Sequence, residues 1–289
     1  MRATWLLAFF LLCLSAASAF AEEAPRAVTV EPAEVFQGGI ARIKVSGKEI
    51  AGVKALLGDK QVMFYPAEGG SHSALLGVDL EQRPGPIEIR VQGWNQSGER
   101  WEGQATIQVR LKEFPQETLS VPADFDRIDS ATRKRIEMEQ TELDQIWKIH
   151  SPRRLWEGGF LAPVPGGVNS PFGLRRVING APRSPHGGVD LKAGLGADVV
   201  AANHGRVVLR KELLFSGKSI VLDHGGGLYT MYFHLSDFGV EKNSRARKGD
   251  VIGWVGMTGR VTGPHLHWGA RLTGARVDPF ALLEATDRQ

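Results

Sequence analysis

The sequence predicts a mainly β protein in which a helical linker joins two β domains. Short runs of alternating polar and apolar residues recur over residues 27–112, which is typical of half-buried strands. One long run with helical spacing follows, and short β-like runs separated by glycines return later. We therefore expect an N-terminal β domain over 27–112, a linker with a helix over 113–159 and a C-terminal domain over 160–284.

The first residues have the layout of a secretory signal peptide. Arg2 precedes an apolar run from Trp5 to Leu14, and Ala19-Phe20-Ala21 forms an A-x-A cleavage site. The alternative is a retained membrane anchor, but the run is short for a span of roughly 20 apolar residues. We expect removal of residues 1–21, secretion across the inner membrane and no membrane span in the mature chain.

Composition narrows the chemistry of the mature protein. The single cysteine, Cys13, lies within the apolar run, so cleavage removes it. The mature chain then has no disulfide framework, and any metal site must use histidines and carboxylates. The net charge of +3 comes without a dense cluster of Lys and Arg, so we expect no nucleic-acid partner.

The sequence of residues 27–112 predicts an immunoglobulin-like β-sandwich. Alternating runs at Arg42–Val45, Ile87–Val91 and Thr106–Leu111 are separated by glycine-containing turns. Several short strands at such spacing are typical of a sandwich. No catalytic constellation occurs here, so this domain could occlude a groove, position an enzyme or bind a regulatory protein.

The best helix candidate of the chain runs from Ser130 to Lys148. Apolar residues recur there at helical spacing, and neither Gly nor Pro interrupts the run. The predicted apolar stripe consists of Ile136, Met138, Leu143, Ile146 and Trp147. We expect this helix to pack on one of the two domains.

The sequence of the C-terminal domain predicts a second, mainly antiparallel β structure. Glycines at the junctions of its short strands fit tight turns and close backbone approach to a groove. The expected strands are 199–201, 206–209, 219–222, 229–233, 251–255 and 265–270.

Six of the eight histidines lie between His186 and His267. His186 precedes Asp190 in the sequence HGGVD, and His265 and His267 are two residues apart. Side chains at i and i+2 of a strand share one face, about 6–7 Å apart, so one of these imidazoles can bind a metal while the other contacts a substrate. His234 ends an apolar run between these two motifs.

Two imidazoles and a carboxylate suit a catalytic zinc site. Zinc with three protein ligands and one open position lowers the pKa of bound water to about 7 and polarises a carbonyl group. A further imidazole can transfer protons near neutral pH. His204 and His224 belong to no such motif, and we expect both at turns in structural roles.

An ordered set of motifs resembles the lysostaphin/LytM-type zinc endopeptidases of peptidase family M23. These motifs are Asn169–Arg175 (NSPFGLR), His186–Leu191 (HGGVDL), Tyr232–Leu235 (YFHL), Gly249–Gly253 (GDVIG) and Gly256–Trp268 (GMTGRVTGPHLHW). The resemblance covers residues 160–281 and implies a LytM-like peptidase domain. It implies one Zn²⁺ per chain on His186, Asp190 and His267, with catalytic imidazoles at His234 and His265.

The expected substrate is cross-linked bacterial peptidoglycan. The signal sequence and the resemblance together indicate a Gram-negative periplasm, where the expected bond joins D-alanine to diaminopimelate. The alternatives are a non-catalytic wall-binding activator of another hydrolase, a carboxypeptidase and a peptidase acting on proteins. Some relatives place a Tyr shortly before the first His; residues 170–185 contain none, so we assign oxyanion stabilisation to zinc and the imidazoles.

Overall fold

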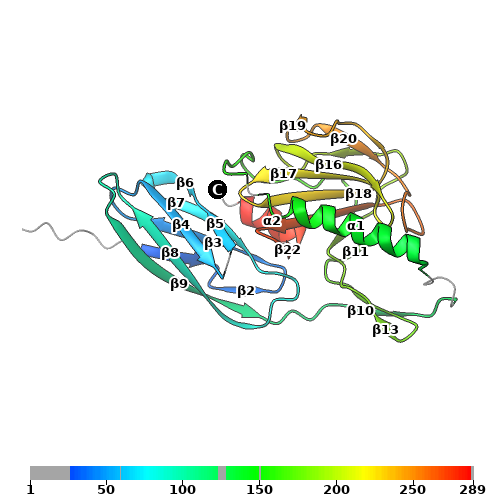
Figure 1. Cartoon of the computed structure of the whole chain (residues 1–289), viewed down its shortest axis with the longest axis horizontal. Helices are drawn as coiled ribbons and strands as arrows, with labels where there is room; N and C mark the ends of the chain where they lie inside the picture. The colour runs from blue at the N-terminus through cyan, green and yellow to red at the C-terminus, as the bar shows by residue number, and fades with distance from the viewer. Residues whose placement is uncertain (1–26, 59, 123–127, 150, 288–289) are drawn as a thin grey trace, which may run out of the picture.

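The computed structural model describes residues 27–58, 60–122, 128–149 and 151–287. The predicted signal peptide lies outside the described residues. The chain forms two β lobes, with the N-terminal sandwich at the left of Figure 1 and the larger C-terminal lobe at the right. This arrangement confirms the predicted mainly β fold. Over the described residues, neither helix is long and apolar enough to cross a membrane.

The N-terminal lobe consists of two sheets. The first has the strand order β1–β3–β7–β6, with β1 at Ala27–Glu31, β3 at Ile40–Ser46, β7 at His72–Gly77 and β6 at Tyr65–Pro66. The second has the order β2–β9–β8–β4–β5, with β2 at Glu34–Phe36, β9 at Arg100–Arg110, β8 at Gly85–Trp94, β4 at Gly52–Leu57 and β5 at Lys60–Met63. A 3-10 turn, η1, spans Glu68–Gly70.

Alternating side chains of both sheets meet in one buried core. Ile43 of β3, Ile89 of β8 and Ile107 of β9 are fully buried within it. The polar residues between them point outward, as the period of two predicts. The three strands expected from the sequence are therefore present, although β9 ends at Arg110 and leaves Leu111 exposed.

The C-terminal lobe is built on an antiparallel sheet. Its main path runs β11–β14–β21–β18–β17–β16–β19; β20 pairs with β15 and β18, and β22 extends β21. The bounds are β11 Val168–Ser170, β14 Gly188–Leu191, β15 Asp198–Val200, β16 Gly205–Leu213, β17 Gly217–Gly225, β18 Leu228–Phe238, β19 Arg245–Ala246, β20 Val251–Val255, β21 Leu266–Leu272 and β22 Ala275–Val277.

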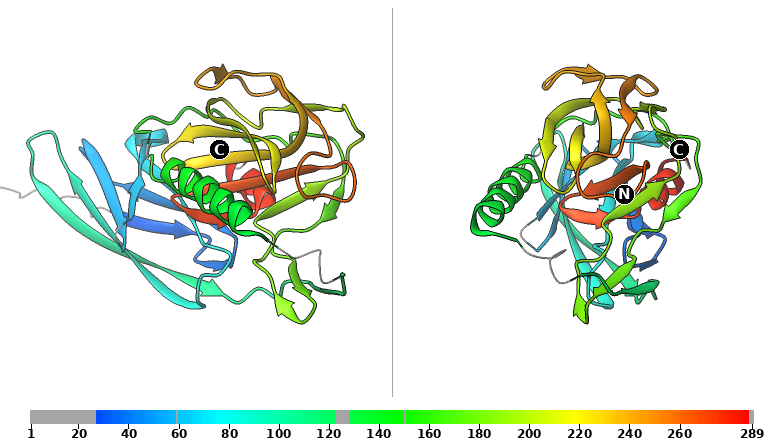
Figure 2. Two further views of the ribbon diagram at one scale, coloured as in Figure 1. Left: turned by 45° about the vertical axis from the view of Figure 1, so that its right-hand side comes forward. Right: turned by 90° about the vertical axis from the view of Figure 1, so that its right-hand side faces the viewer.

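The two helices cover opposite faces of this sheet (Figure 2). Helix α2 (Pro279–Asp287) packs on the face that buries Tyr232 and Trp268. Helix α1 (Ser130–Ile146) packs on the other face, where Trp147 meets the ring of Tyr229 edge to face at 5.3 Å. We expected this helix to pack on one of the two domains, and the structure places it on the C-terminal domain.

Helix α1 begins where the sequence offers a capping side chain. The Asp129 carboxylate accepts a hydrogen bond of 2.7 Å from the Thr132 backbone, which satisfies one of the free N–H groups of the first turn. Ile146 and Trp147 are buried at the other end. The expectation that Met138 widens the apolar stripe is wrong, because its side chain is 58% exposed on the solvent side of the helix.

Part of the expected linker is built into the C-terminal lobe. Strand β10 (Gln116–Leu119) pairs in parallel with β12 (Arg175–Ile178), and β13 (Ala181–Pro182) completes a small sheet. Trp156 is buried in the same core as the large sheet. Long-range pairing thus ties these segments to the C-terminal lobe.

The sandwich docks at one end of the large sheet. The Arg276 guanidinium of β22 donates hydrogen bonds to Asp79 and Glu81, each at 2.7 Å, and Leu80 lies in the core of the C-terminal lobe. These contacts lie near the end of β21, whereas its first residues carry the histidine motif. The docked lobe therefore holds the sheet at the end away from His267.

Candidate metal centre

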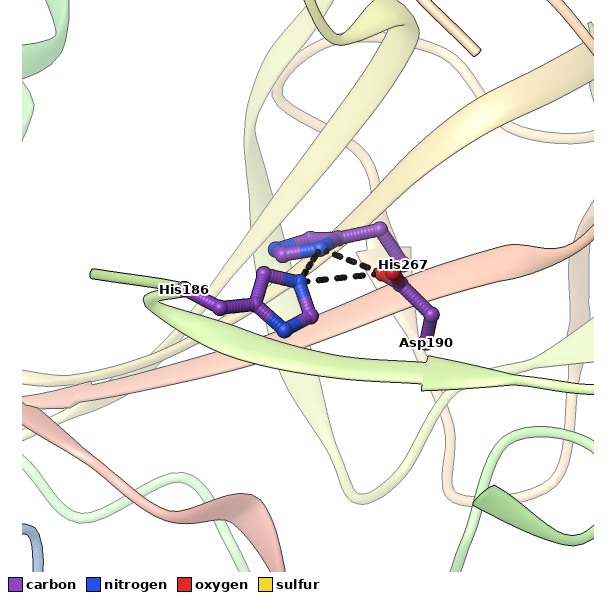
Figure 3. Close-up of side chains that lie close together, drawn as sticks. All are labelled: His186, Asp190 and His267. Carbon is purple, nitrogen blue, oxygen red and sulfur yellow. Dashed lines mark hydrogen bonds and ion pairs between the residues drawn. The ribbon is translucent and has the colours of Figure 1, made fainter. Parts of the chain in front are cut away.

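Strand pairing brings two distant parts of the chain to one point. Strands β14 and β21 run antiparallel, with Asp190 directly opposite His267. Residues opposite one another in such a pair carry their side chains on the same face. His186 lies just before β14, and its ring turns toward the other two side chains (Figure 3).

Three ligand atoms form an almost equilateral triangle. His186 Nε2, His267 Nδ1 and Asp190 Oδ1 are each 3.0 Å from the other two. Within the described residues, this is the only group of three or more His, Cys, Asp or Glu side chains placed to hold a metal. Ligands about 2.0–2.1 Å from a tetrahedral zinc lie about 3.3 Å apart, so the residues fit that ion.

A backbone carbonyl and a hydroxyl fix the imidazole of His186. Its Nδ1 lies 3.0 Å from the Pro171 carbonyl oxygen, which can only accept a hydrogen bond. The proton therefore resides on Nδ1, and the Nε2 lone pair faces Asp190. The Ser170 hydroxyl lies 3.4 Å from the same Nδ1. Such outer partners orient metal-binding histidines and set their tautomer.

The ring of His267 is held between an aromatic face and a glycine. Phe233 stacks on it with an interplanar angle of 6° and a centroid distance of 5.2 Å. On β14, a Cβ atom added to Gly188 would lie 2.8 Å from His267 Nε2 and 2.5 Å from the Trp268 carbonyl oxygen. Only glycine lets the β14 backbone pass this close to the ring.

His234 and His265 complete a cluster of four imidazoles around Asp190. Their ring centroids are 5.0 Å apart, and His265 Nε2 lies 3.7 Å from Asp190 Oδ1. His265 donates from Nδ1 to the Gly263 carbonyl, and His234 donates from Nδ1 to the Thr258 carbonyl, each at 2.9 Å. In the neutral tautomer that donates from Nδ1, the Nε2 atom of each ring carries no proton.

A break in strand register positions His234. Tyr232 pairs with Ile220 and Leu235 pairs with Lys218, so β18 has one more residue than β17 between these pairs. His234 lies in this bulge with a φ of 64°, a left-handed conformation that is uncommon for a residue other than glycine. Bulges near active sites redirect side chains, and this one turns His234 toward His265.

Burial and hydrogen bonding set the charges of the cluster. Burial, reinforced by the neighbouring His267, lowers the pKa of His234 to about 4, so this ring is neutral at pH 7. Burial also lowers the pKa of His267. Burial alone would raise the pKa of Asp190, but the adjoining imidazoles of His186 and His267 hold it well below its usual range. The cluster thus offers one carboxylate, with neutral imidazoles at His234 and His267.

The structure brings together all five residues selected from the sequence, whereas His204 and His224, the other two histidines between residues 186 and 267, take no part. His224 lies in β17 and is fully buried; its nitrogens contact the His204 carbonyl and the Thr230 hydroxyl, each at 2.7 Å. The expected turn position of His224 is therefore wrong, although its structural role holds.

Sequence reasoning missed the residues that orient the cluster. These residues are Phe233, Gly188, Pro171 and Thr258; each lies within one of the five sequence motifs, but residue spacing does not indicate their contacts. Their effects depend on strand register and on backbone carbonyls, which residue type does not specify.

Three ligand atoms around one point, with further imidazoles beside them, are the arrangement of a metallopeptidase centre. Residues 184–279 match the model of Peptidase family M23. A solved structure from Pseudomonas aeruginosa, titled as an M23 peptidase, is 30% identical with a TM-score of 0.67, and the match covers 86% of this chain and 95% of that one. The chain belongs to peptidase family M23.

Curated relatives match the C-terminal lobe. The DD-carboxypeptidase/endopeptidase Mpg of Neisseria meningitidis is 37% identical over 119 residues, or 41% of this chain and 27% of that protein. The peptidoglycan DD-endopeptidase ShyA of Vibrio cholerae is 37% identical over 112 residues, or 38% of this chain and 26% of that protein. The chain thus matches only about a quarter of the length of these relatives.

Proposed function

We propose that the protein is a secreted zinc metallo-endopeptidase that hydrolyses peptide cross-links of peptidoglycan. One observation carries the proposal: three ligand atoms lie 3.0 Å apart beside two imidazoles whose Nδ1 atoms are held by backbone carbonyls. Hydrolysis of an amide needs an activated water, a partner for the developing oxyanion and a proton donor for the leaving amine. These residues can supply each requirement.

His186, Asp190 and His267 would hold the ion. The N₂O donor set with an open position suits zinc, which supplies Lewis acidity and lowers the pKa of water to about 7. Asp190 contributes the negative charge of the set, and the Pro171 carbonyl keeps Nε2 of His186 free of a proton. Phe233 holds the plane of the His267 ring.

His265 and His234 would move the protons. Nε2 of His265, near Asp190, takes a proton from the attacking water as general base. The protonated imidazole then donates to the leaving amine, and His234 contributes a second imidazole beside the developing oxyanion. Either ring in its neutral form can serve as the base, since Nδ1 of each bonds a backbone carbonyl and Nε2 then accepts the proton.

The proposed bond is the D-alanyl–diaminopimelate cross-link of a Gram-negative wall. Support comes from the names of the relatives, which include peptidoglycan DD-endopeptidases, and from the signal-like N-terminus, which is consistent with a periplasmic enzyme. The name of the Neisseria relative also favours a carboxypeptidase activity on terminal D-alanine.

Digestion of purified peptidoglycan followed by mass spectrometry tests the proposal. We expect cross-linked dimers to disappear with wild-type protein and to persist with His265→Ala, while both proteins bind zinc. Release of terminal D-alanine without loss of dimers would indicate a carboxypeptidase instead. Unchanged muropeptides with zinc-loaded wild-type protein would favour a non-catalytic wall-binding protein. Full activity of His265→Ala would refute its role as the base.

A further inference from the structure

A cavity of about 460 Å³ opens beside the imidazole cluster. Its lining consists of Asn169, Lys192, Ala193, Gly194, Pro264 and His265. It therefore shares one wall with the proposed general base. A substrate held at His265 would bring the groups next to the scissile bond to the side chains of this cavity.

Lys192 is the cation of this cavity, and its position follows from the strand that carries Asp190. Strand β14 ends at Leu191, so Lys192 is two residues beyond Asp190. Side chains at i and i+2 of an extended segment lie on the same side. The Lys192 backbone N–H donates to the Gly167 carbonyl at 2.8 Å, which holds the segment beyond the strand in place.

The ammonium group of Lys192 is available for a ligand. Its side chain is exposed and makes no ion pair or hydrogen bond with any residue that the structure describes. Two further cations near the cluster are engaged in ion pairs: Arg176 binds Glu117 at 3.2 Å and Lys218 binds Asp237 at 3.2 Å. An unpaired cation beside a cleavage site attracts an anionic group of the substrate.

We propose that Lys192 binds the free carboxylate on the amine side of the scissile bond, an inference that rests on the proposed function. In a D-alanyl–diaminopimelate cross-link, the carbon that bears the scissile nitrogen also bears a free carboxylate. A terminal D-alanyl-D-alanine has the same arrangement. One ammonium group therefore recognises both substrates, because the carboxylate lies at the same number of bonds from the scissile nitrogen.

This contact distinguishes wall peptides from ordinary proteins. Within a protein chain, the group that follows the scissile nitrogen is another amide, which carries no charge. A lysine ammonium is a compact point charge that forms strong hydrogen bonds with carboxylates. Lys192 thus favours substrates with a free carboxylate on the amine side of the scissile bond. A substrate with an amide at that position lacks the ionic interaction with Lys192.

Two matched substrates test the proposal. One is an N-acylated D-alanyl-D-alanine peptide with a free C-terminal carboxylate, and the other is its C-terminal amide. The variants are Lys192→Met, which keeps chain length without charge, and Lys192→Arg, which keeps the charge. Lys48→Met, at an exposed position on the sandwich, is the control.

For zinc-loaded wild-type protein, kcat/KM should be about tenfold or more higher for the acid than for the amide. Lys192→Met should remove that preference by lowering the rate for the acid alone, and Lys192→Arg should restore much of it. Equal rates for acid and amide in wild type, or an equal loss for both substrates in Lys192→Met, would overturn the proposal.

Binding provides a measurement that needs no turnover. Calorimetric titration of the acid and the amide into zinc-loaded His265→Ala protein should show tighter binding of the acid. The double variant that also carries Lys192→Met should bind the two ligands equally. If wild type cleaves no wall peptide but the preference in binding persists, the proposed function fails and the carboxylate site stands. If cleavage is intact without any preference, the carboxylate site fails alone.

Discussion

Asp190 of β14 lies directly opposite His267 of β21, and its Oδ1 is 3.0 Å from Nδ1 of that imidazole. The residues are 77 positions apart, so only the pairing of the two strands brings them together. His186 joins them from the same segment as Asp190: it lies two residues before β14, and its Nε2 is 3.0 Å from Asp190 Oδ1. The proposed metal site thus depends on the register of a single strand pair.

Replacement of Asp190 by Asn should abolish metal binding without unfolding the protein. The amide has nearly the same shape but lacks the charge that makes a carboxylate a zinc ligand. We expect zinc affinity to fall by at least about 100-fold, as measured by metal analysis after dialysis against a competing chelator. Asp198→Asn, at an exposed position on β15, should retain full zinc content. Stoichiometric zinc in Asp190→Asn would contradict the assignment.

Gly188→Ala should disturb the site through packing alone. The added methyl would overlap His267 Nε2 and the Trp268 carbonyl oxygen, so β14 and β21 must separate. We expect a loss of about 1–3 kcal/mol in unfolding free energy and a drop of about 10- to 100-fold in zinc affinity. The matched change Gly167→Ala adds a methyl that meets nothing within 4 Å and should alter neither quantity.

His234→Ala should separate catalysis from metal binding. His234 donates to the Thr258 carbonyl and is not one of the three proposed ligands. We expect zinc content to remain and the turnover of wall peptides to fall by roughly 10²–10⁴-fold, the usual contribution of a positioned acid or base. Loss of zinc together with activity would instead make His234 a structural support of the metal site. His204→Ala, outside the cluster, should retain activity.

Trp147→Ala should detach helix α1 from the sheet. Trp147 is 9% exposed and contacts Tyr229, so its removal leaves a large cavity beside the face that carries Phe233. We expect unfolding in denaturant to show a loss of about 3–5 kcal/mol. Met138→Ala, on the exposed side of the same helix, should change stability by less than about 0.5 kcal/mol.

The ion pair between Asp79 and Arg276 should make lobe docking sensitive to acid. Burial raises the pKa of Asp79, but hydrogen bonds from Arg276 and from backbone N–H groups more than offset this and hold the pKa below its ordinary value of 3.8. A depressed pKa in the folded state contributes stability above pH 3.8, and that stability is lost as pH falls through the lower folded value.

Asp79→Asn should therefore destabilise the protein at pH 7 by about 2 kcal/mol. The difference from wild type should shrink only below pH 3.8, where the wild-type carboxyl also becomes neutral. Denaturant unfolding between pH 3 and pH 7 measures this. A difference that is constant over the whole range would show that charge is not the cause. Glu88→Gln, whose partner Arg90 is exposed, is the matched control.

Local patterns in the sequence were sufficient for most strands and for the histidine motifs. Alternation in residues 42–45 and 87–91 predicted strands that the structure contains, because a half-buried strand must alternate. The spacing of His265 and His267 predicted a shared face for the same reason, and both lie beside Asp190. Helix α1 was equally visible from its uninterrupted apolar spacing.

Tertiary structure alone decided how these pieces act together. The sequence could not place His186 against His267, because that contact depends on long-range strand register. It could not indicate the bulge that turns His234, the stacking of Phe233, or the exposure of Met138, since each depends on what lies across the fold. Residue spacing determined the chemistry available within each segment, whereas pairing between distant segments determined which atoms meet.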